Sequence, residues 1–161
     1  MNILILGIGN LVMADDGIGV RVVQQLQKRF RFPENVAVMD GGTLGLDLLP
    51  ALEGVTHLIV VDAVETGVAP GTLVRLEGEE LPIALETKLS PHQMGLKDLL
   101  AVARLIGHEP GVMVLHGVQP GNIEMDEHLT PEVEAVRDIL CQKVLDELAL
   151  FGVVPAVTGC S

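Results

Sequence analysis

Short apolar runs alternate along the chain with longer stretches in which apolar residues recur every three or four positions. The short runs predict strands at residues 3–8, 36–40, 58–61, 72–76 and 112–118. The periodic stretches predict helices at residues 17–30, 90–106 and 130–151, and a short helix that ends near residue 52. Residues 58–61 are apolar at every position, which is typical of a central parallel strand covered on both faces.

This alternation predicts an α/β protein in which a largely parallel sheet has helices on both faces. Residues 1–152 are expected to form one domain, and residues 153–161 a flexible C-terminal tail. In such folds the working site lies at the carboxyl ends of the strands. Polar residues just beyond a strand end, or at a helix start, are therefore the candidates for chemistry.

Five acidic or histidine side chains meet this condition. Asp15 and Asp16 close the loop after the first strand, Asp40 ends the second strand, Asp62 ends the central strand, and His92 begins a helix. All five are expected near the same rim of the sheet. Two carboxylates and one imidazole, with coordination positions left open, suit a divalent transition metal that must also hold a group of the substrate.

Each candidate also has an ordinary structural explanation. Asp16 could cap the helix that follows it, and Asp62 could bond backbone amides at the strand end. His92 could be a surface histidine, although a neutral imidazole at the positive end of a helix dipole is well suited to ligation. Another histidine, His116, interrupts an apolar strand and is expected to be a hydrogen-bonded core residue.

Two glycine-containing segments have similar alternatives. Gly7 and Gly9 favour a tight turn that requires positive φ, because Val12 stands at the third glycine position of a dinucleotide motif. Residues 40–43, Asp-Gly-Gly-Thr, are either a turn with a helix cap or a backbone that a peptide substrate can approach closely.

Composition excludes several classes of function. The 22 acidic and 10 basic residues give a formal net charge of −12, and Trp and Tyr are absent, so nucleic acid is not an expected partner. No apolar stretch reaches the about 18 residues of a membrane-spanning helix, and the N-terminus lacks a signal-peptide pattern. Cys141 is predicted to be a buried, inert thiol and Cys160 lies in the tail, so no disulfide framework is indicated. A soluble cytoplasmic protein is expected.

Four segments occur in the order and approximate spacing of one known family. They are residues 7–19 (GIGNLVMADDGIG), 40–43 (DGGT), 61–63 (VDA) and 90–93 (SPHQ). Over about residues 1–150 the chain resembles the maturation endopeptidases of nickel–iron hydrogenases. The resemblance implies a three-layer α/β/α fold with a five-stranded sheet. It also implies removal of a C-terminal peptide from the nickel-loaded precursor of the hydrogenase large subunit.

By position, the resemblance assigns roles to the candidate residues. Asp16, Asp62 and His92 fall on the family's metal-binding residues and would act catalytically through that metal. Asp40 falls on a family aspartate implicated in substrate handling. Substrate binding is assigned to Asp40, Gly41, Gly42 and Thr43. Nickel is expected to arrive with the precursor, and the enzyme is expected to be a monomer.

Two other functions share parts of this pattern. The Gly-x-Gly-Asn opening is similar to that of peptidyl-tRNA hydrolase, but that enzyme expects Pro-Gly after Asn10, where Leu11 and Val12 stand, and a basic binding face. A nickel carrier or sensor could use the same three ligands. Three ligands without a thiolate predict weak intrinsic affinity for nickel, which favours the endopeptidase.

Overall fold

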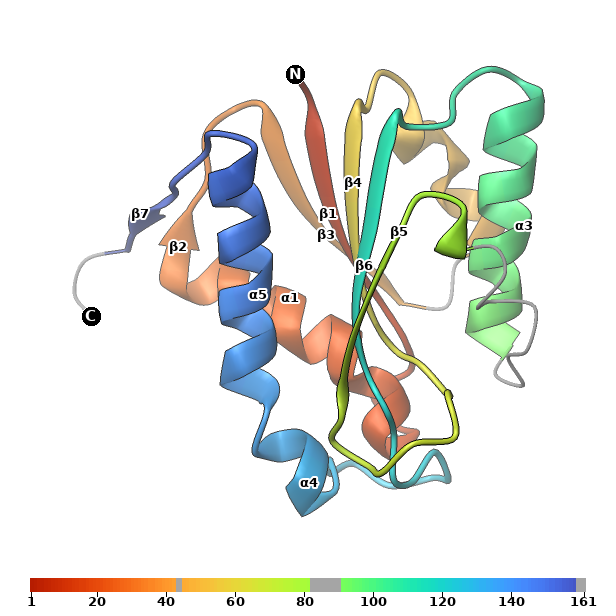
Figure 1. The fold of residues 1–161 in the computed structure, drawn as a ribbon, viewed down its shortest axis with the longest axis vertical. Helices are drawn as coiled ribbons and strands as arrows, with labels where there is room; N and C mark the ends of the chain where they lie inside the picture. The colour runs from red at the N-terminus through yellow and green to blue at the C-terminus, as the bar shows by residue number, and fades with distance from the viewer. Residues whose placement is uncertain (43–44, 82–90, 159–161) are drawn as a thin grey trace.

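The central layer is a five-stranded sheet with the strand order β3-β1-β4-β6-β5 (Figure 1). In this computed structural model, residues 1–42, 45–81 and 91–158 are described, without the side chains of residues 45 and 91–95. The strands are β1 (Ile3–Ile8), β3 (Val36–Gly42), β4 (His57–Ala63), β5 (Leu73–Glu77) and β6 (Val112–Val118). Only β5 is antiparallel, at the edge next to β6, so the predicted mostly parallel sheet is confirmed.

Helical layers cover both faces of this sheet, as predicted (Figure 1). One face carries α1 (Ile18–Arg29) and α5 (Arg137–Leu150). The other face carries α3 (Pro91–Leu105) and the 3-10 segment η2 (Gly45–Leu52). Within the described residues, no helix is both long and apolar enough to cross a membrane.

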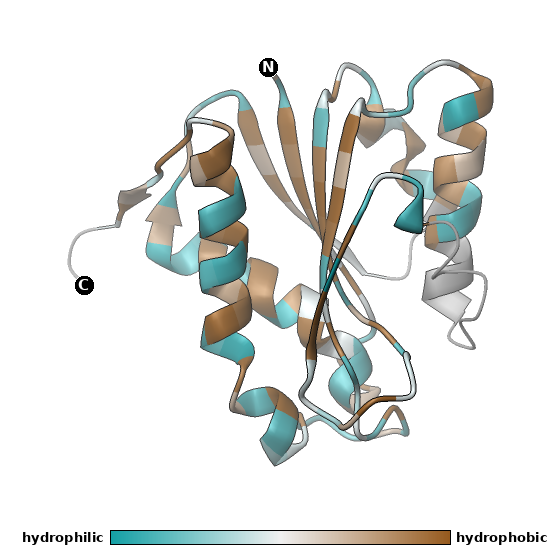
Figure 2. Ribbon diagram, viewed as in Figure 1, coloured by the Kyte–Doolittle hydropathy of each residue, from teal (hydrophilic) through white to brown (hydrophobic). Residues whose placement is uncertain are grey.

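Each face of the sheet carries its own apolar core, because successive residues of a strand point to opposite faces. Ile3 and Ile5 of β1 pack into the core under α1 and α5. Leu4 and Leu6 pack into the core under α3 and η2. Figure 2 shows the result as strands that are apolar along most of their length between helices of mixed polarity.

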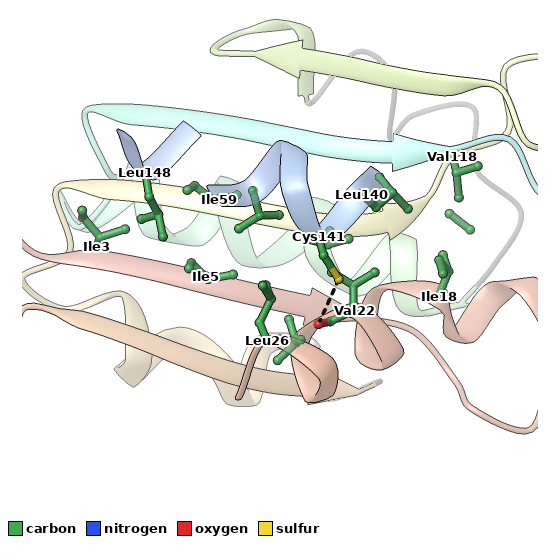
Figure 3. Close-up of a cluster of buried hydrophobic side chains, with 14 of the residues drawn as sticks. Ile3, Ile5, Ile18, Val22, Leu26, Ile59, Val118, Leu140, Cys141 and Leu148 are labelled. Carbon is green, nitrogen blue, oxygen red and sulfur yellow. Dashed lines mark hydrogen bonds between the residues drawn. The ribbon is translucent and has the colours of Figure 1, made fainter. Parts of the chain in front are cut away.

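Cys141 lies inside the first of these cores (Figure 3). Its Sγ atom is 4.0 Å from the carbonyl oxygen of Val22 on α1. Burial raises the pKa of the Cys141 thiol to about 11, so the thiol stays protonated at neutral pH. The predicted burial of Cys141 is confirmed.

The last predicted helix is divided into two. α4 (Pro131–Glu134) is followed by a bend at Val136, which has φ −108° and ψ 3°, and α5 begins after it. Both Val133 before the bend and Leu140 after it are buried in the core. The bend therefore lets two differently directed segments contribute to one core.

Residues 156–158, within the tail predicted to be flexible, have backbone partners near the end of α1. β7 (Ala156–Val157) pairs antiparallel with β2 (Phe30–Arg31), which directly follows α1. The amide of Thr158 also donates to the Arg29 carbonyl at 2.9 Å, and its hydroxyl donates to the Lys28 carbonyl at 3.0 Å. These backbone partners fix the segment. Cys160 lies outside the described residues.

His116 is a hydrogen-bonded core residue, as predicted. Its Nε2 lies 2.8 Å from Oε1 of Glu147 on α5, and both side chains are buried. Arg75, opposite His116 on β5, donates from Nε to Oε1 of Glu147 at 2.9 Å and from Nη2 to Oε2 at 3.2 Å. This group ties the edge of the sheet to α5.

His116 and Glu147 are expected to make stability fall with acidification. Burial lowers the pKa of His116 below its ordinary 6.5, despite its hydrogen bond to Glu147. Burial opposes ionisation of Glu147, but the hydrogen bonds from Arg75 and His116 prevail and lower its pKa. Both groups therefore bind protons more readily in the unfolded chain, so stability is lost below about pH 6.5 through His116 and, on further acidification, through Glu147.

Urea unfolding at several pH values measures this effect. Between about pH 6.5 and 5.5, His116 adds a slope of at most about 1.4 kcal/mol per pH unit to the free energy of unfolding. The variant His116→Gln keeps an amide donor for Glu147 but does not titrate, so its slope is expected to be shallower. Equal slopes for the two proteins would contradict the prediction.

Candidate functional site

The candidate site lies where β1 and β4 end side by side. The chain leaves β1 toward β3 and leaves β4 in the opposite direction, toward β5 and β6. Ligands of open α/β sheets bind at such a reversal, outside the carboxyl ends of the strands. Figure 1 shows these ends in the lower half of the molecule, next to the start of α1.

Asp16 and Asp62 come to this rim from two elements that pack together. Asp16 lies in the 3-10 turn η1 (Ala14–Gly17), which contacts β4, and Asp62 is the penultimate residue of β4. Their side chains are buried, with 4% and 0% of each residue exposed. The structure therefore brings together two of the three predicted ligand positions.

The structural role predicted for Asp62, a hydrogen bond to a backbone amide, is present, whereas the helix cap predicted for Asp16 is not. Gly17 is the N-cap of α1, and among the described side chains none caps that helix. Oδ2 of Asp16 instead accepts from the Asn10 amide at 3.2 Å. Asp16 thus braces its own loop. Asp62 does accept from a backbone amide, that of Ala63, through Oδ1 at 2.8 Å.

Glycines allow η1 and α1 to lie directly on the strand ends. Gly9 has φ +140°, as predicted, and a Cβ there would overlap the Asp16 carbonyl oxygen. Gly7 does not have positive φ; it is needed because a Cβ would overlap the Gly19 carbonyl oxygen. A Cβ at Gly19 would in turn overlap the Val61 carbonyl oxygen. The glycines of this segment therefore allow η1 and α1 to pack closely against the strand ends.

Asp15 has a structural role that its neighbour does not share. Its residue is 0% exposed, and its Oδ2 accepts from the amides of Gly121 and Asn122 at 2.7 and 3.1 Å. Thr130 donates its amide to Oδ1 at 2.7 Å and its hydroxyl to Oδ2 at 2.8 Å. One carboxylate thus fixes both ends of the segment 121–130.

The segment 121–130 is also bonded to the loop that carries Asp16. The amide of Ala14 donates to the Asp126 carbonyl at 2.8 Å, and the amide of Asp126 donates to the Val12 carbonyl at 3.0 Å. Ala14 itself has φ +49°, an unusual conformation for alanine that these bonds hold in place. Sequence reasoning missed this partnership because no local signal connects the two segments.

Gln119 is a second residue that sequence reasoning missed. It is 3% exposed and follows β6, and its Oε1 accepts from the amide and hydroxyl of Thr66 at 2.8 and 3.2 Å. Its Nε2 donates to Oε2 of Glu65 at 2.9 Å. Gln119 therefore ties the loop after β4 to the loop after β6. Gln119 directly follows β6, and this position beyond a strand end is the signal in the sequence that marks it.

Asp40 lies at the same rim with an exposed side chain, and β3 continues two residues beyond it. Its Oδ1 accepts from the Gly42 amide at 2.9 Å, and Gly42 has φ +49°. An open hollow of about 250 Å³ is lined by Gly9, Asn10, Leu11, Val20, Asp40 and Gly42. Gly41 is buried under β1 side chains, and Thr43 lies outside the described residues.

His92 is the second residue of α3, and its side chain lies outside the description. α3 leads into the start of β6, so its first turn is directed toward the carboxyl end of the sheet (Figure 1). Among the described side chains, no three His, Cys, Asp or Glu residues gather as a metal site. The three-ligand metal site therefore stays a prediction.

Comparisons with known proteins agree with this architecture. The family model for HycI hydrogenase maturation proteases matches residues 20–147. The Escherichia coli (strain K12) hydrogenase 2 maturation protease is 42% identical over 154 residues, which cover 95% of this chain and 94% of that protein. HoxM, a hydrogenase expression/formation protein of Azotobacter vinelandii, is 45% identical over 157 residues, covering 96% of this chain and 76% of HoxM.

Solved structures give the same answer. The hydrogenase maturating endopeptidase HybD from E. coli superimposes with a TM-score of 0.95 at 41% identity, over 100% of both chains. HybD from Thermococcus kodakarensis, a nickel–iron hydrogenase maturation protease, has a TM-score of 0.76 at 27% identity, covering 92% of this chain and 99% of that one. This chain therefore belongs to the hydrogenase maturation protease family, whose members hydrolyse peptide bonds.

Proposed function

We propose that this protein removes a C-terminal peptide from the large-subunit precursor of a hydrogenase after nickel has been inserted into that precursor. Asp16, Asp62 and His92 engage the nickel, which belongs to the substrate. The observation that carries the proposal is the pair of buried carboxylates at the reversal between β1 and β4. The chain that carries this pair is 42% identical to a hydrogenase 2 maturation protease.

The donor set suits the ion. Carboxylate oxygen and imidazole nitrogen are ligands of divalent first-row metals, and nickel binds such donors more tightly than manganese or iron does. Three ligands from the enzyme leave coordination positions for groups of the precursor. When bound, nickel supplies a positive charge that can orient the scissile peptide and polarise its carbonyl.

The residues of the enzyme hold and orient the peptide. Asn10 braces Asp16 through its amide, and the Gly19 contact sets the start of α1 against β4, so these positions are formed before the substrate arrives. The hollow beside Asp40 receives the peptide, because Gly9 and Gly42 present bare backbone there. We assign substrate binding to Asp40, Gly41, Gly42 and Thr43.

The proposal includes a cytoplasmic monomer. A folded partner must reach the rim of the sheet, which a subunit interface there would obstruct. Cys141 is a free, buried cysteine, which fits a reducing compartment.

A cleavage assay on nickel-loaded and nickel-free precursor tests the proposal. Intact-mass measurement is expected to show loss of a C-terminal peptide from the loaded precursor only. Cleavage of both forms would show that the enzyme does not need nickel to recognise the precursor. Cleavage of neither, together with tight nickel binding by the enzyme alone in calorimetry, would support the carrier function instead.

A further inference from the structure

We propose that a surface beside the site docks the folded body of the precursor. This docking surface is centred on Val12, Met125 and Glu127, which line one hollow. It includes Ile123 and Glu124, the exposed residues that precede Met125 in the chain. The inference rests on the proposed function and extends it, since it concerns a region of the precursor away from the peptide that is cut.

The apolar members of this surface are exposed to solvent. Val12 is 51%, Ile123 42% and Met125 82% exposed. Val12 and Met125 line an open hollow of about 510 Å³, together with Asp126, Glu127 and His128. Exposed apolar side chains around a hollow, rimmed by polar residues, mark a site of protein interaction.

The docking surface is built before a partner arrives. Its two segments are joined by the backbone bonds between Val12, Ala14 and Asp126, and the second segment is fixed at both ends by the buried Asp15. Binding to a surface that is already ordered loses little conformational entropy. An exposed Met125 on such a support is therefore available as an anchor.

The position of the surface identifies its occupant. Val12 lies four residues before Asp16 in the same loop, so a precursor that presents nickel to Asp16 must lie against this loop. A second copy of this chain is disfavoured, because each copy carries a net charge of −12 and the surface itself includes exposed Glu124 and Glu127. The precursor face that fits here is apolar with a basic rim.

Steady-state kinetics on the nickel-loaded precursor test this inference. The double variant Val12→Thr and Met125→Gln keeps side-chain size but removes apolar surface, and KM is expected to rise about tenfold with kcat unchanged. The matched control is Leu150→Gln, which changes a residue 77% exposed at the end of α5 and is expected to leave KM unchanged. Glu124→Lys with Glu127→Lys is expected to raise KM at low salt and less so at high salt.

The possible outcomes separate this inference from the proposed function. If the unmodified enzyme does not cleave the precursor, the proposed function fails. If it does cleave and the Val12/Met125 variant keeps the same KM, the docking surface is overturned. A fall in kcat in that variant, with unchanged thermal unfolding, would also overturn it, because the loops would then be positioning Asp16. Self-association of the enzyme that this variant abolishes would assign the surface to a second copy.

Discussion

Asp62→Asn is expected to reduce precursor cleavage by at least about 100-fold while the protein stays folded. Asparagine has the same shape, and its Oδ1 can still accept the hydrogen bond from the Ala63 amide. The substitution removes the negative charge and with it the ligand that we propose for the nickel carried by the precursor. Activity and stability are therefore separated at this position.

The measurement is kcat/KM on nickel-loaded precursor, with urea unfolding of the same samples. Asp47→Asn, on an exposed position of η2, removes the same charge away from the rim and is the matched control. Normal cleavage by Asp62→Asn would exclude Asp62 from the site. Unfolding at a lower urea concentration than the control would show that Asp62 is structural.

Asp15→Ala, unlike Asp62→Asn, is expected to destabilise the fold, with a loss of about 3–5 kcal/mol in the free energy of unfolding. The carboxylate accepts four hydrogen bonds, from the amides of Gly121, Asn122 and Thr130 and from the Thr130 hydroxyl. Alanine leaves four partly buried donors without the Asp15 carboxylate that accepts from them.

Thr130→Val is the graded control for this prediction. It removes the hydroxyl donor and keeps the amide bond to Asp15, so about 1 kcal/mol is expected. Urea unfolding of both variants gives the comparison. A cost for Asp15→Ala no greater than that for Thr130→Val would mean that the network contributes little to stability.

The strands were predictable where nearly all of their residues are apolar. β1 (Ile3–Ile8) and β6 (Val112–Val118) have the predicted bounds. β3 is longer than predicted, because Asp40 and the two glycines after it look like a turn in sequence. In the structure Asp40 is paired with Gly7, and Gly42 with Ile8. Pairing with β1 therefore extends the strand through residues whose own β-propensity is low.

The positions of the three aspartates at the rim could be predicted, but their contacts could not. The strand-end rule finds Asp15, Asp16 and Asp62, but it cannot tell two adjacent aspartates apart. Their roles differ because the partners of Asp15 are 106 to 115 residues further along the chain. The pairing of β7 with β2 was missed for the same reason, since its partner strand is contributed by residues near the end of α1.

The long separation between Asp15 and its partners also orders events during synthesis. At about 5–20 residues per second, a ribosome releases Asp15 roughly 5–20 s before Thr130. Until then the carboxylate lacks the donors that bury it, and the loop with Asp16 lacks the segment that supports it. A nascent chain therefore completes the support of the loop that carries Asp16 only after Thr130 has been synthesised.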